Sequence, residues 1–214
     1  MDLQLKDKTA LITGSTAGIG YGIARQLLKE GAHVIINGRT EERINSAINQ
    51  LQNSIPECNV TGCVADFSNK QQIDQLISAH DSVDILINNT GGPPAGPAYK
   101  APAEEYISAF NLHLINNHNM VQACIPNMQQ KGFGRIINVI STSVKIPLNG
   151  LGVSNTIRGA VGNWSKTLAN ELGSFGITVN NILPGATATE RLSSIISGKS
   201  AKTGKSIEEV EKAM

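Results

Sequence analysis

The sequence of 214 residues predicts a single α/β domain in which helices cover both faces of a doubly wound parallel sheet. Three observations support this fold class. Short apolar runs typical of strands alternate with amphipathic segments typical of helices along the chain. A turn that contains three glycines joins the first strand to the first helix. The composition, 40% hydrophobic but only 4% aromatic, predicts a core of isoleucine, leucine, valine and alanine, as in buried parallel sheets.

The first strand and helix organise the rest of the chain. An apolar run at residues 9–13 predicts the strand, and apolar residues from Ile19 onward recur at helical spacing. Between them, Gly14 allows a tight turn, Gly18 lets the backbone approach a ligand, and Gly20 lets the helix lie close to the sheet.

This turn has the chemistry of a phosphate site. Free backbone N–H groups and the positive end of the helix dipole meet where a strand turns into a helix. Ser15 and Thr16 add hydroxyl donors at the same place. A glycine loop without a ligand is the alternative, but the strand before it and the helix after it favour nucleotide binding.

The remaining segments continue the alternation. The loop at residues 89–98 holds the densest group of Gly and Pro residues, which predicts a structural break or a site. A long helix contains Pro126, where we predict a bend. We predict strands at residues 33–37, 59–64, 83–88, 135–140 and 178–183, and helices at residues 41–52, 70–80, 104–130 and 152–175.

This alternation also predicts the topology. Parallel strands joined by helices require right-handed crossovers. Two βαβ halves then give the strand order 3-2-1-4-5-6, with a ligand at the carboxyl ends of the strands.

Charge and composition argue against several classes of function. A net charge of +1 without a basic run makes nucleic acid an improbable partner. No stretch approaches the length of a membrane span, and the N-terminus lacks the apolar core of a signal peptide, so we expect a cytoplasmic protein that does not enter a membrane. Neither the three cysteines nor the four histidines have metal-ligand spacing, so we expect no metal site.

The motifs together resemble the short-chain dehydrogenase/reductase family. The glycine turn reads Thr-Gly-x-x-x-Gly-x-Gly, the fourth strand is followed by Asn-Asn-Thr-Gly at residues 88–91, and Pro-Gly-x-x-x-Thr begins at Pro184. The resemblance runs from about Lys6 to Arg191. It implies a Rossmann-type fold and a nicotinamide dinucleotide cofactor.

The resemblance also implies where the cofactor binds. In the family an acid at the position of Asp66 hydrogen-bonds the adenine amine. Arg39 stands where an NAD site usually has an acid, so we predict pairing with a 2′-phosphate and NADP(H) in preference to NAD(H). A surface arginine that only starts the next helix is the alternative. The predicted cofactor-binding residues are Gly14, Ser15, Thr16, Gly18, Ile19, Gly20, Arg39, Asp66, Phe67, Asn89, Gly91, Arg158, Pro184, Gly185 and Thr189.

Two of the family's four catalytic positions are matched. In the family, a serine after the fifth strand polarises the carbonyl, a tyrosine donates the proton, a lysine lowers the tyrosine pKa, and a helix asparagine completes a proton relay. Ser141 matches the serine, with Ser143 as its competitor, and Asn111 matches the asparagine.

The other two positions depart from the family. Ser154 falls at the tyrosine position and Arg158 at the lysine position, so YxxxK becomes Ser-Asn-Thr-Ile-Arg. An aliphatic hydroxyl is a much weaker acid than a phenol, whose pKa is about 10. Arginine keeps the positive charge, and can stabilise an oxyanion, but does not release a proton. This segment and the Gly-Gly-Pro-Pro run resemble a divergent branch near the β-ketoacyl carrier-protein reductases with an imperfect catalytic tetrad.

The sequence therefore predicts an NADP(H)-dependent oxidoreductase that interconverts a carbonyl and an alcohol. Its substrate would be a small molecule, with an acyl thioester among the candidates. The alternative is a catalytically inactive nucleotide-binding homologue with a regulatory or partner role. A scaffold that binds no cofactor is a third alternative, against which the intact glycine turn argues.

The final segment differs in character from the rest. Ser206 to Glu209 has the pattern of a capping box, which predicts a helix with Ile207, Val210 and Met214 on its apolar face. In the family this region is a mobile lid over the substrate. We therefore assign residues 1–191 to the dinucleotide-binding domain and residues 192–214 to a partial substrate-lid segment of the same domain. We also expect a homodimer or homotetramer that forms through the two long helices.

Overall fold

Six parallel strands form one sheet in the computed structural model, which describes residues 3–80 and 82–212. Their order is β3-β2-β1-β4-β5-β6, which confirms the predicted order. The bounds of the strands lie within two residues of those predicted. The strands are β1 (Thr9–Ile12), β2 (His33–Gly38), β3 (Val60–Val64), β4 (Ile85–Asn88), β5 (Gly134–Val139) and β6 (Ile177–Ile182).

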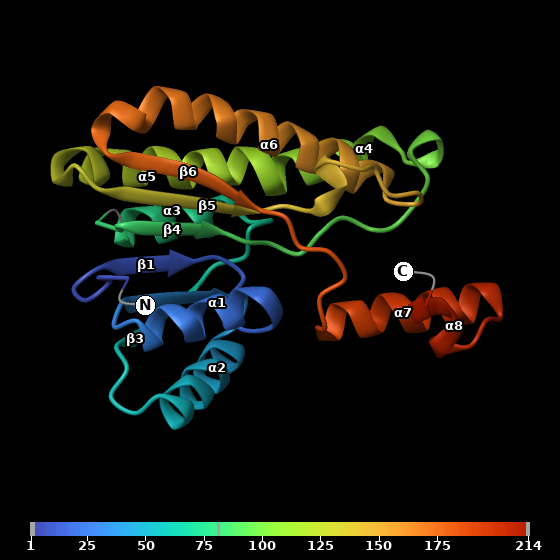
Figure 1. Cartoon of the computed structure of the whole chain (residues 1–214), viewed down its shortest axis with the longest axis horizontal. Coiled ribbons are helices and arrows are strands. Elements are labelled where there is room, and N and C mark those ends of the chain that lie inside the picture. The colour runs from blue at the N-terminus through green and yellow to red at the C-terminus, as the bar shows by residue number, and fades with distance from the viewer. Residues whose placement is uncertain (1–2, 81, 213–214) are drawn as a thin grey trace.

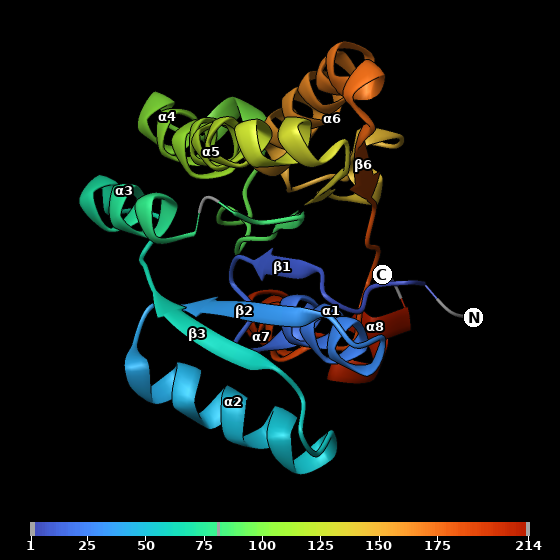
Figure 2. The same ribbon diagram turned by 90° about the vertical axis from the view of Figure 1, so that its left-hand side faces the viewer.

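Helices cover both faces of this sheet. The helices α1 and α2 pack on one face, whereas α3, α5 and α6 pack on the other (Figures 1 and 2). The helices are α1 (Gly18–Lys29), α2 (Glu41–Ser54), α3 (Lys70–Ala79), α4 (Ala103–Phe110), α5 (Asn116–Lys131), α6 (Gly152–Leu172), α7 (Glu190–Thr203) and α8 (Ile207–Lys212), with short turns η1 (Ala98–Lys100), η2 (Asn111–Ile115), η3 (Thr142–Val144) and η4 (Gly173–Phe175).

Alternate residues of the four inner strands, β2, β1, β4 and β5, supply two hydrophobic cores. Successive side chains of a strand point to opposite faces of the sheet. In β1, Leu11 packs with residues of α3, α5 and α6, whereas Ala10 and Ile12 pack with residues of α1 and α2. All three are fully buried, which explains why the strands read as continuous apolar runs rather than as alternating ones.

The long helix predicted at residues 104–130 consists of three consecutive pieces. Between α4 and α5, η2 has the hydrogen bonding of a π-helix. α5 then runs through Pro126 without ending. The predicted helix is thus divided at η2, whereas at Pro126 the helix continues although proline has no N–H to donate to the preceding turn; the bend predicted there stays a prediction. Single π turns inside α-helices occur often at functional sites, and no sequence pattern identified this one.

The two C-terminal helices lie beyond the carboxyl ends of the strands (Figure 1). The capping box of α8 forms as predicted, because the Glu209 N–H donates to Ser206 Oγ and the Ser206 N–H donates to Glu209 Oε2. Val210 is buried, Ile207 is exposed, and Met214 lies outside the described residues. Within the described part of the chain, no helix is both long enough and apolar enough to cross a membrane.

Candidate functional site

The glycine turn adopts a backbone that only glycine accommodates easily. Gly14 and Gly18 have φ angles of 56° and 58°, in the left-handed region. A Cβ atom on Gly14 would lie 2.6 Å from the backbone oxygen of Asn89, and one on Gly20 would lie 2.5 Å from the backbone oxygen of Gly14. The turn therefore packs directly against the end of β4 and against the start of α1.

Ser15 is placed differently from our expectation. We predicted that its hydroxyl would face a ligand, but the residue is fully buried. Ser15 Oγ donates to the backbone oxygen of Ile12 at 2.6 Å and accepts from the Asn37 N–H at 2.9 Å. A hydroxyl has one proton, so Ser15 supports the turn from inside instead of donating to a ligand.

Asn37 holds the turn to the end of β2. Its Oδ1 accepts from the Gly14 N–H at 3.0 Å, and its Nδ2 donates to the backbone oxygens of Cys63 and Ala65 on the next strand. The side chain is 2% exposed. This residue is not among those predicted from the sequence, although a polar residue at the end of a buried strand is the signal that could have found it.

Asn89 holds the turn from the opposite side. Its Nδ2 donates to the backbone oxygens of Thr13 and Gly14, at 3.1 and 2.8 Å. Its backbone N–H and backbone oxygen both bond to the Thr13 hydroxyl. These four bonds join the carboxyl ends of β1 and β4, where the topology predicts the ligand.

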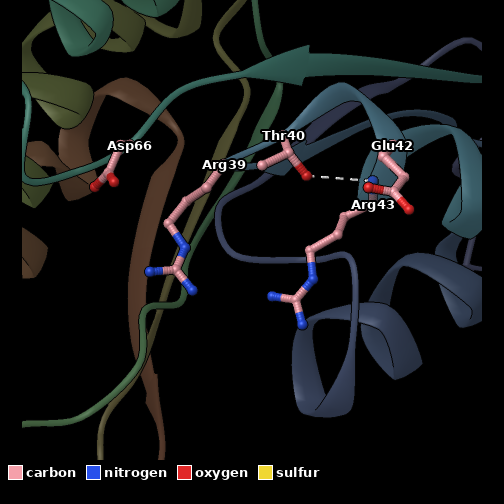
Figure 3. Close-up of a pocket in the computed structure, with 5 residues that line it drawn as sticks. All are labelled: Arg39, Thr40, Glu42, Arg43 and Asp66. Carbon is pink, nitrogen blue, oxygen red and sulfur yellow. Dashed lines mark hydrogen bonds between the residues drawn. The ribbon is translucent and has the colours of Figure 1, made fainter.

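A hollow of about 490 Å³ lies at the end of β2, beside this turn. Its lining includes the guanidinium groups of Arg39 and Arg43, which extend to the same side (Figure 3). Thr40 caps α2 by accepting from the Arg43 N–H. Among the described residues, neither guanidinium lies within 4.0 Å of a carboxylate oxygen. Two unpaired positive charges at a helix N-terminus suit a phosphate.

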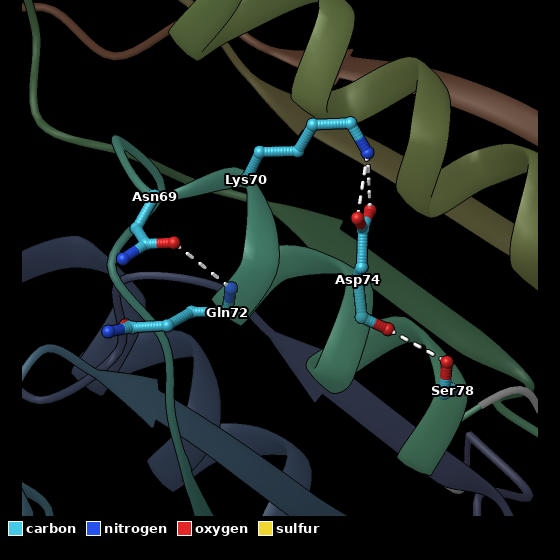
Figure 4. A network of polar contacts seen from close by, with 5 residues as sticks. All are labelled: Asn69, Lys70, Gln72, Asp74 and Ser78. Carbon is cyan, nitrogen blue, oxygen red and sulfur yellow. Dashed lines mark hydrogen bonds and ion pairs between the residues drawn. The ribbon is translucent and has the colours of Figure 1, made fainter.

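Asp66 lines the same hollow from the end of β3. Hydrogen bonds from the backbone and then from the hydroxyl of Ser68 lower the pKa of its carboxyl group, and the charge of Arg39 adds a smaller effect in the same direction. The start of α3, capped by Asn69 (Figure 4), fixes this segment, because Gln72 Oε1 accepts from the Asp66 N–H at 2.7 Å. Asp66 is therefore held ionised at neutral pH.

Phe67 was predicted together with Asp66, but its side chain packs in the core. It is 7% exposed and contacts the core residues under α3 and α5. Its backbone oxygen accepts from Asn116 Nδ2 at 2.6 Å. The phenyl ring anchors the segment, so this residue has only its backbone N–H to offer a ligand.

We expect Asp66→Asn to make the free energy of unfolding less dependent on pH. A carboxyl group whose pKa is lowered by folding stabilises the protein above its unfolded pKa, about 4, and this contribution is lost as the pH falls through the folded pKa. Denaturant titrations at several pH values should show a constant gap between the two proteins above about pH 4 that closes below it. A gap that widens in acid would contradict this.

Residues after β6 lie opposite the glycine turn. We call the space between these two segments, at the carboxyl ends of the strands, the cleft. The methyl group of Thr189 lies 3.6 Å from where a Cβ atom on Gly18 would be. Thr189 also caps α7 by accepting from the Leu192 N–H, and the backbone oxygen of Pro184 accepts from the Thr142 N–H. The glycine turn and the Pro-Gly-x-x-x-Thr segment thus face one another across the carboxyl ends of the strands.

Ser141 and Asn111 lie at this same end of the sheet. Ser141 follows β5, is half-buried, and caps η3 by accepting from the Ser143 N–H at 3.1 Å. Its competitor Ser143 is 2% exposed and therefore less accessible to a substrate. Asn111 is the exposed first residue of η2.

Ser154 and Arg158 lie one turn apart on α6. Ser154 is half-buried, whereas Arg158 is 8% exposed. Arg158 Nη1 donates to the backbone oxygen of Val139 at 2.8 Å, two residues before Ser141. The structure thus brings the guanidinium to the end of β5. The Gly- and Pro-rich loop reaches the start of α6, since Gly96 bonds to Gly150 and Gly152, the residues on either side of Leu151.

Comparisons with known proteins identify the family. The family model described as short chain dehydrogenase matches residues 8–200. The chain belongs to the short-chain dehydrogenase family. YvaG of Bacillus subtilis, an uncharacterized oxidoreductase, is 31% identical over 211 residues, which is 99% of this chain and 80% of YvaG. The 3-oxoacyl-[acyl-carrier-protein] reductase FabG of Rickettsia felis is 37% identical over 185 residues, 86% of this chain and 74% of FabG.

Solved structures of short-chain dehydrogenases agree with the fold. L-sorbose reductase from Gluconobacter frateurii, complexed with NADPH and L-sorbose, superposes with a TM-score of 0.89 at 28% identity. That comparison covers 97% of this chain and 80% of the reductase. The Rossmann-type topology predicted from the sequence is therefore confirmed.

The cysteines and the possible metal ligands of this short-chain dehydrogenase are further candidates for chemistry, next to the cofactor residues. None of the three cysteines forms a disulfide, and burial raises the pKa of the Cys63 thiol to about 12, so this thiol stays protonated. Within residues 3–80 and 82–212, no group of three or more His, Cys, Asp or Glu side chains could hold a metal ion.

Proposed function

We propose that this short-chain dehydrogenase is an NADP(H)-dependent oxidoreductase that interconverts a carbonyl and an alcohol. The observation that carries the proposal is the hollow with Arg39 and Arg43 beside a glycine turn that a side chain would obstruct. A dianionic 2′-phosphate fits two guanidinium groups that have no carboxylate partner among the described residues. The NADPH complex of L-sorbose reductase supports the same cofactor.

The residues of the cleft fit such a cofactor. The turn at Gly14, Thr16, Gly18 and Ile19 would hold the pyrophosphate, with Ser15 and Gly20 as the internal supports of this turn. The other predicted ligands stand at the ends of the following strands. We propose that Arg39 binds the 2′-phosphate, that Asp66 binds the adenine, and that Arg158 binds the nicotinamide ribose. Asn89 and Gly91 would line the ribose side of the cleft, and Pro184, Gly185 and Thr189 would line the opposite side. Phe67 would anchor the segment that carries Asp66.

The proposed chemistry takes place at the end of β5. NADPH, when bound, supplies a hydride to the carbonyl carbon. The Ser141 hydroxyl would donate a hydrogen bond to the carbonyl oxygen and so stabilise the charge that develops there. Asn111 would hold a water molecule that brings protons to the site.

Ser154 and Arg158 would replace the tyrosine and lysine of the family. Arg158 keeps a positive charge near the reacting oxygen, and this charge favours the alkoxide over the carbonyl. Ser154 is a poor acid, so we propose that the proton reaches the alkoxide from water held by Ser154 and Asn111 instead of from the serine itself.

A catalytically inactive nucleotide-binding protein is the second candidate. It is favoured by Arg158, whose Nη1 already donates to Val139, and by the short side chain of Ser154. Such a protein would keep the cofactor cleft and lose the turnover.

Titration with NADPH, followed by nicotinamide fluorescence, tests both candidates. Ketones and β-ketoacyl thioesters are then added to the same sample, the thioesters because FabG of Rickettsia felis is a relative. Binding with turnover that falls at least about tenfold in Ser141→Ala would support the enzyme, since such a donor contributes at least this much. Binding without turnover, also in Ser154→Tyr with Arg158→Lys, would support the second candidate. Absence of binding would reject both.

We also propose that α7 and α8 belong to the substrate lid and that the chain self-associates. α7 begins at the cleft wall, at Thr189. Ile107, Phe110 and Ile115 expose apolar surface along α4 and η2, where a second copy of the chain would bury it. A monomer in sedimentation equilibrium would contradict the self-association.

A further inference from the structure

A hydrogen bond between Thr90 and His113 joins two edges of the cleft, and the proposed function gives it no role. Thr90 Oγ1 lies 2.7 Å from His113 Nδ1, and the tautomer of the ring decides which atom donates. His113 is 1% exposed and Thr90 is half-buried. A buried hydrogen bond of this length fixes the distance between the two backbone segments, because separating the partners would cost both of them the bond.

Thr90 belongs to the cofactor edge of the cleft. It follows Asn89, which holds Thr13 and Gly14 through four hydrogen bonds. β4 pairs with β5 as far as Asn88, which lies opposite Asn138, and Thr90 follows two residues later. A shift of Thr90 would therefore also displace Asn89, whose side chain holds the glycine turn.

His113 belongs to the opposite edge. It is the central residue of η2, the π turn that begins with Asn111. His113 is also the one residue of η2 whose side chain is buried, whereas Asn111 and Ile115 are exposed. η2 packs against α6, the helix that carries Ser154 and Arg158. A π turn is a rare departure from α-helical bonding, so it persists where tertiary contacts hold it.

We propose that His113 is a positioning residue: through Thr90 it holds the π turn, and with it Asn111, at a fixed distance from the glycine turn. This proposal rests on the proposed function in one respect: Asn111 is taken to act in catalysis, and Asn89 and Gly91 are taken to bind the cofactor of the same reaction. The bond would make the cofactor edge and the catalytic edge of the cleft move as one unit.

The test uses variants of the full chain that remove the bond from either end. Thr90→Val keeps the shape without the hydroxyl, and His113→Phe keeps a ring without the nitrogen. Thr90→Ser and His113→Asn keep a polar atom in place and serve as matched controls. Amide hydrogen exchange of residues 111–115 reports on the π turn, with residues 41–54 of α2 as the internal reference. NADPH titration and turnover report on the site.

We expect Thr90→Val and His113→Phe each to raise exchange at residues 111–115 by about tenfold, the effect of one hydrogen bond. The double variant should exchange no faster than either single variant, because both remove the same bond. Both controls should stay near wild type. The turnover number should fall about tenfold while the Kd for NADPH changes less than about twofold, since the bonds of Asn89 remain.

Three results would overturn the proposal. The first is an unchanged exchange rate at residues 111–115. The second is a double variant in which the increases in exchange rate of the two single variants add. The third is an equal increase in the exchange rate of α2, which would mean a general loss of stability. An unchanged turnover number with faster local exchange would overturn the positioning role alone. A wild-type protein that neither binds NADPH nor turns over would reject the proposed function, and the exchange data would still decide whether the bond holds the π turn.

Discussion

Replacing Arg39 with alanine is expected to weaken NADPH binding about thirtyfold and to leave NADH binding within about twofold. Arg39 and Arg43 line the hollow at the end of β2, and neither has a carboxylate partner among the described residues. A charge-assisted contact with a phosphate is worth about 1.5–3 kcal/mol, and every 1.4 kcal/mol corresponds to a tenfold change in Kd. NADH lacks the 2′-phosphate, so it loses little.

The double variant Arg39→Ala with Arg43→Ala should weaken NADPH binding by about a hundredfold or more, a larger loss than that of the single variant but less than twice its free energy, because the two guanidinium groups share one phosphate. Fluorescence titrations with both cofactors measure these effects. Arg25→Ala is the matched control, since Arg25 is an exposed arginine on α1 outside the hollow. Equal weakening of NADH and NADPH, or an Arg25 variant that behaves in the same way, would contradict a specific phosphate contact.

Gly20→Ala is expected to lower the melting temperature by about 5–10 °C and to abolish measurable NADPH binding. The new Cβ atom would lie 2.5 Å from the backbone oxygen of Gly14 and 2.6 Å from Asn89 Nδ2. The first neighbour is a backbone atom, and the second is held by hydrogen bonds to the backbone oxygens of Thr13 and Gly14, so α1 must move away from the turn. Such overpacking costs about 1–3 kcal/mol, and it displaces the N–H groups that would hold the pyrophosphate.

Gly22→Ala provides the control within the same helix. A Cβ atom on Gly22 would meet no other atom within 4 Å. Because alanine is a better helix former than glycine, this variant should be more stable by about 0.5–1 kcal/mol and should bind NADPH normally. Thermal melts and titrations of both variants separate packing at the turn from a general effect of alanine in α1. Similar behaviour of the two variants would show that the close contact at Gly20 does not matter.

The strands and the glycine turn could be predicted because their signals are local. β1 and β2 consist mostly of apolar residues that follow one another in the sequence. Three glycines at characteristic spacing then lead from β1 into the helical pattern of α1. Right-handed crossovers then leave few possible strand orders. Arg39 and Asp66 could be selected for the same reason, since each stands at the end of a predicted strand; the structure places both in the lining of the hollow, and their roles toward a cofactor stay predictions.

Errors arose where a residue's role depends on partners far away in the chain. Ser15 looked like a ligand donor, but its hydroxyl donates to Ile12 and accepts from Asn37 on another strand. Phe67 was placed at the cofactor, but its ring packs in the core. Asn37 was missed although a polar residue at the end of a buried strand is a local signal, and Arg43 was missed because nothing in its local sequence shows that it lines the hollow.

By itself the sequence determined the order of the strands and the place of the glycine turn, because periodicity and glycine spacing are properties of short segments. Only the tertiary structure decided that the helix change lies at η2, that Arg158 reaches Val139, and that Thr90 meets His113. The last two contacts join residues that are 19 and 23 positions apart, so they exist only once the sheet has brought the strand ends together.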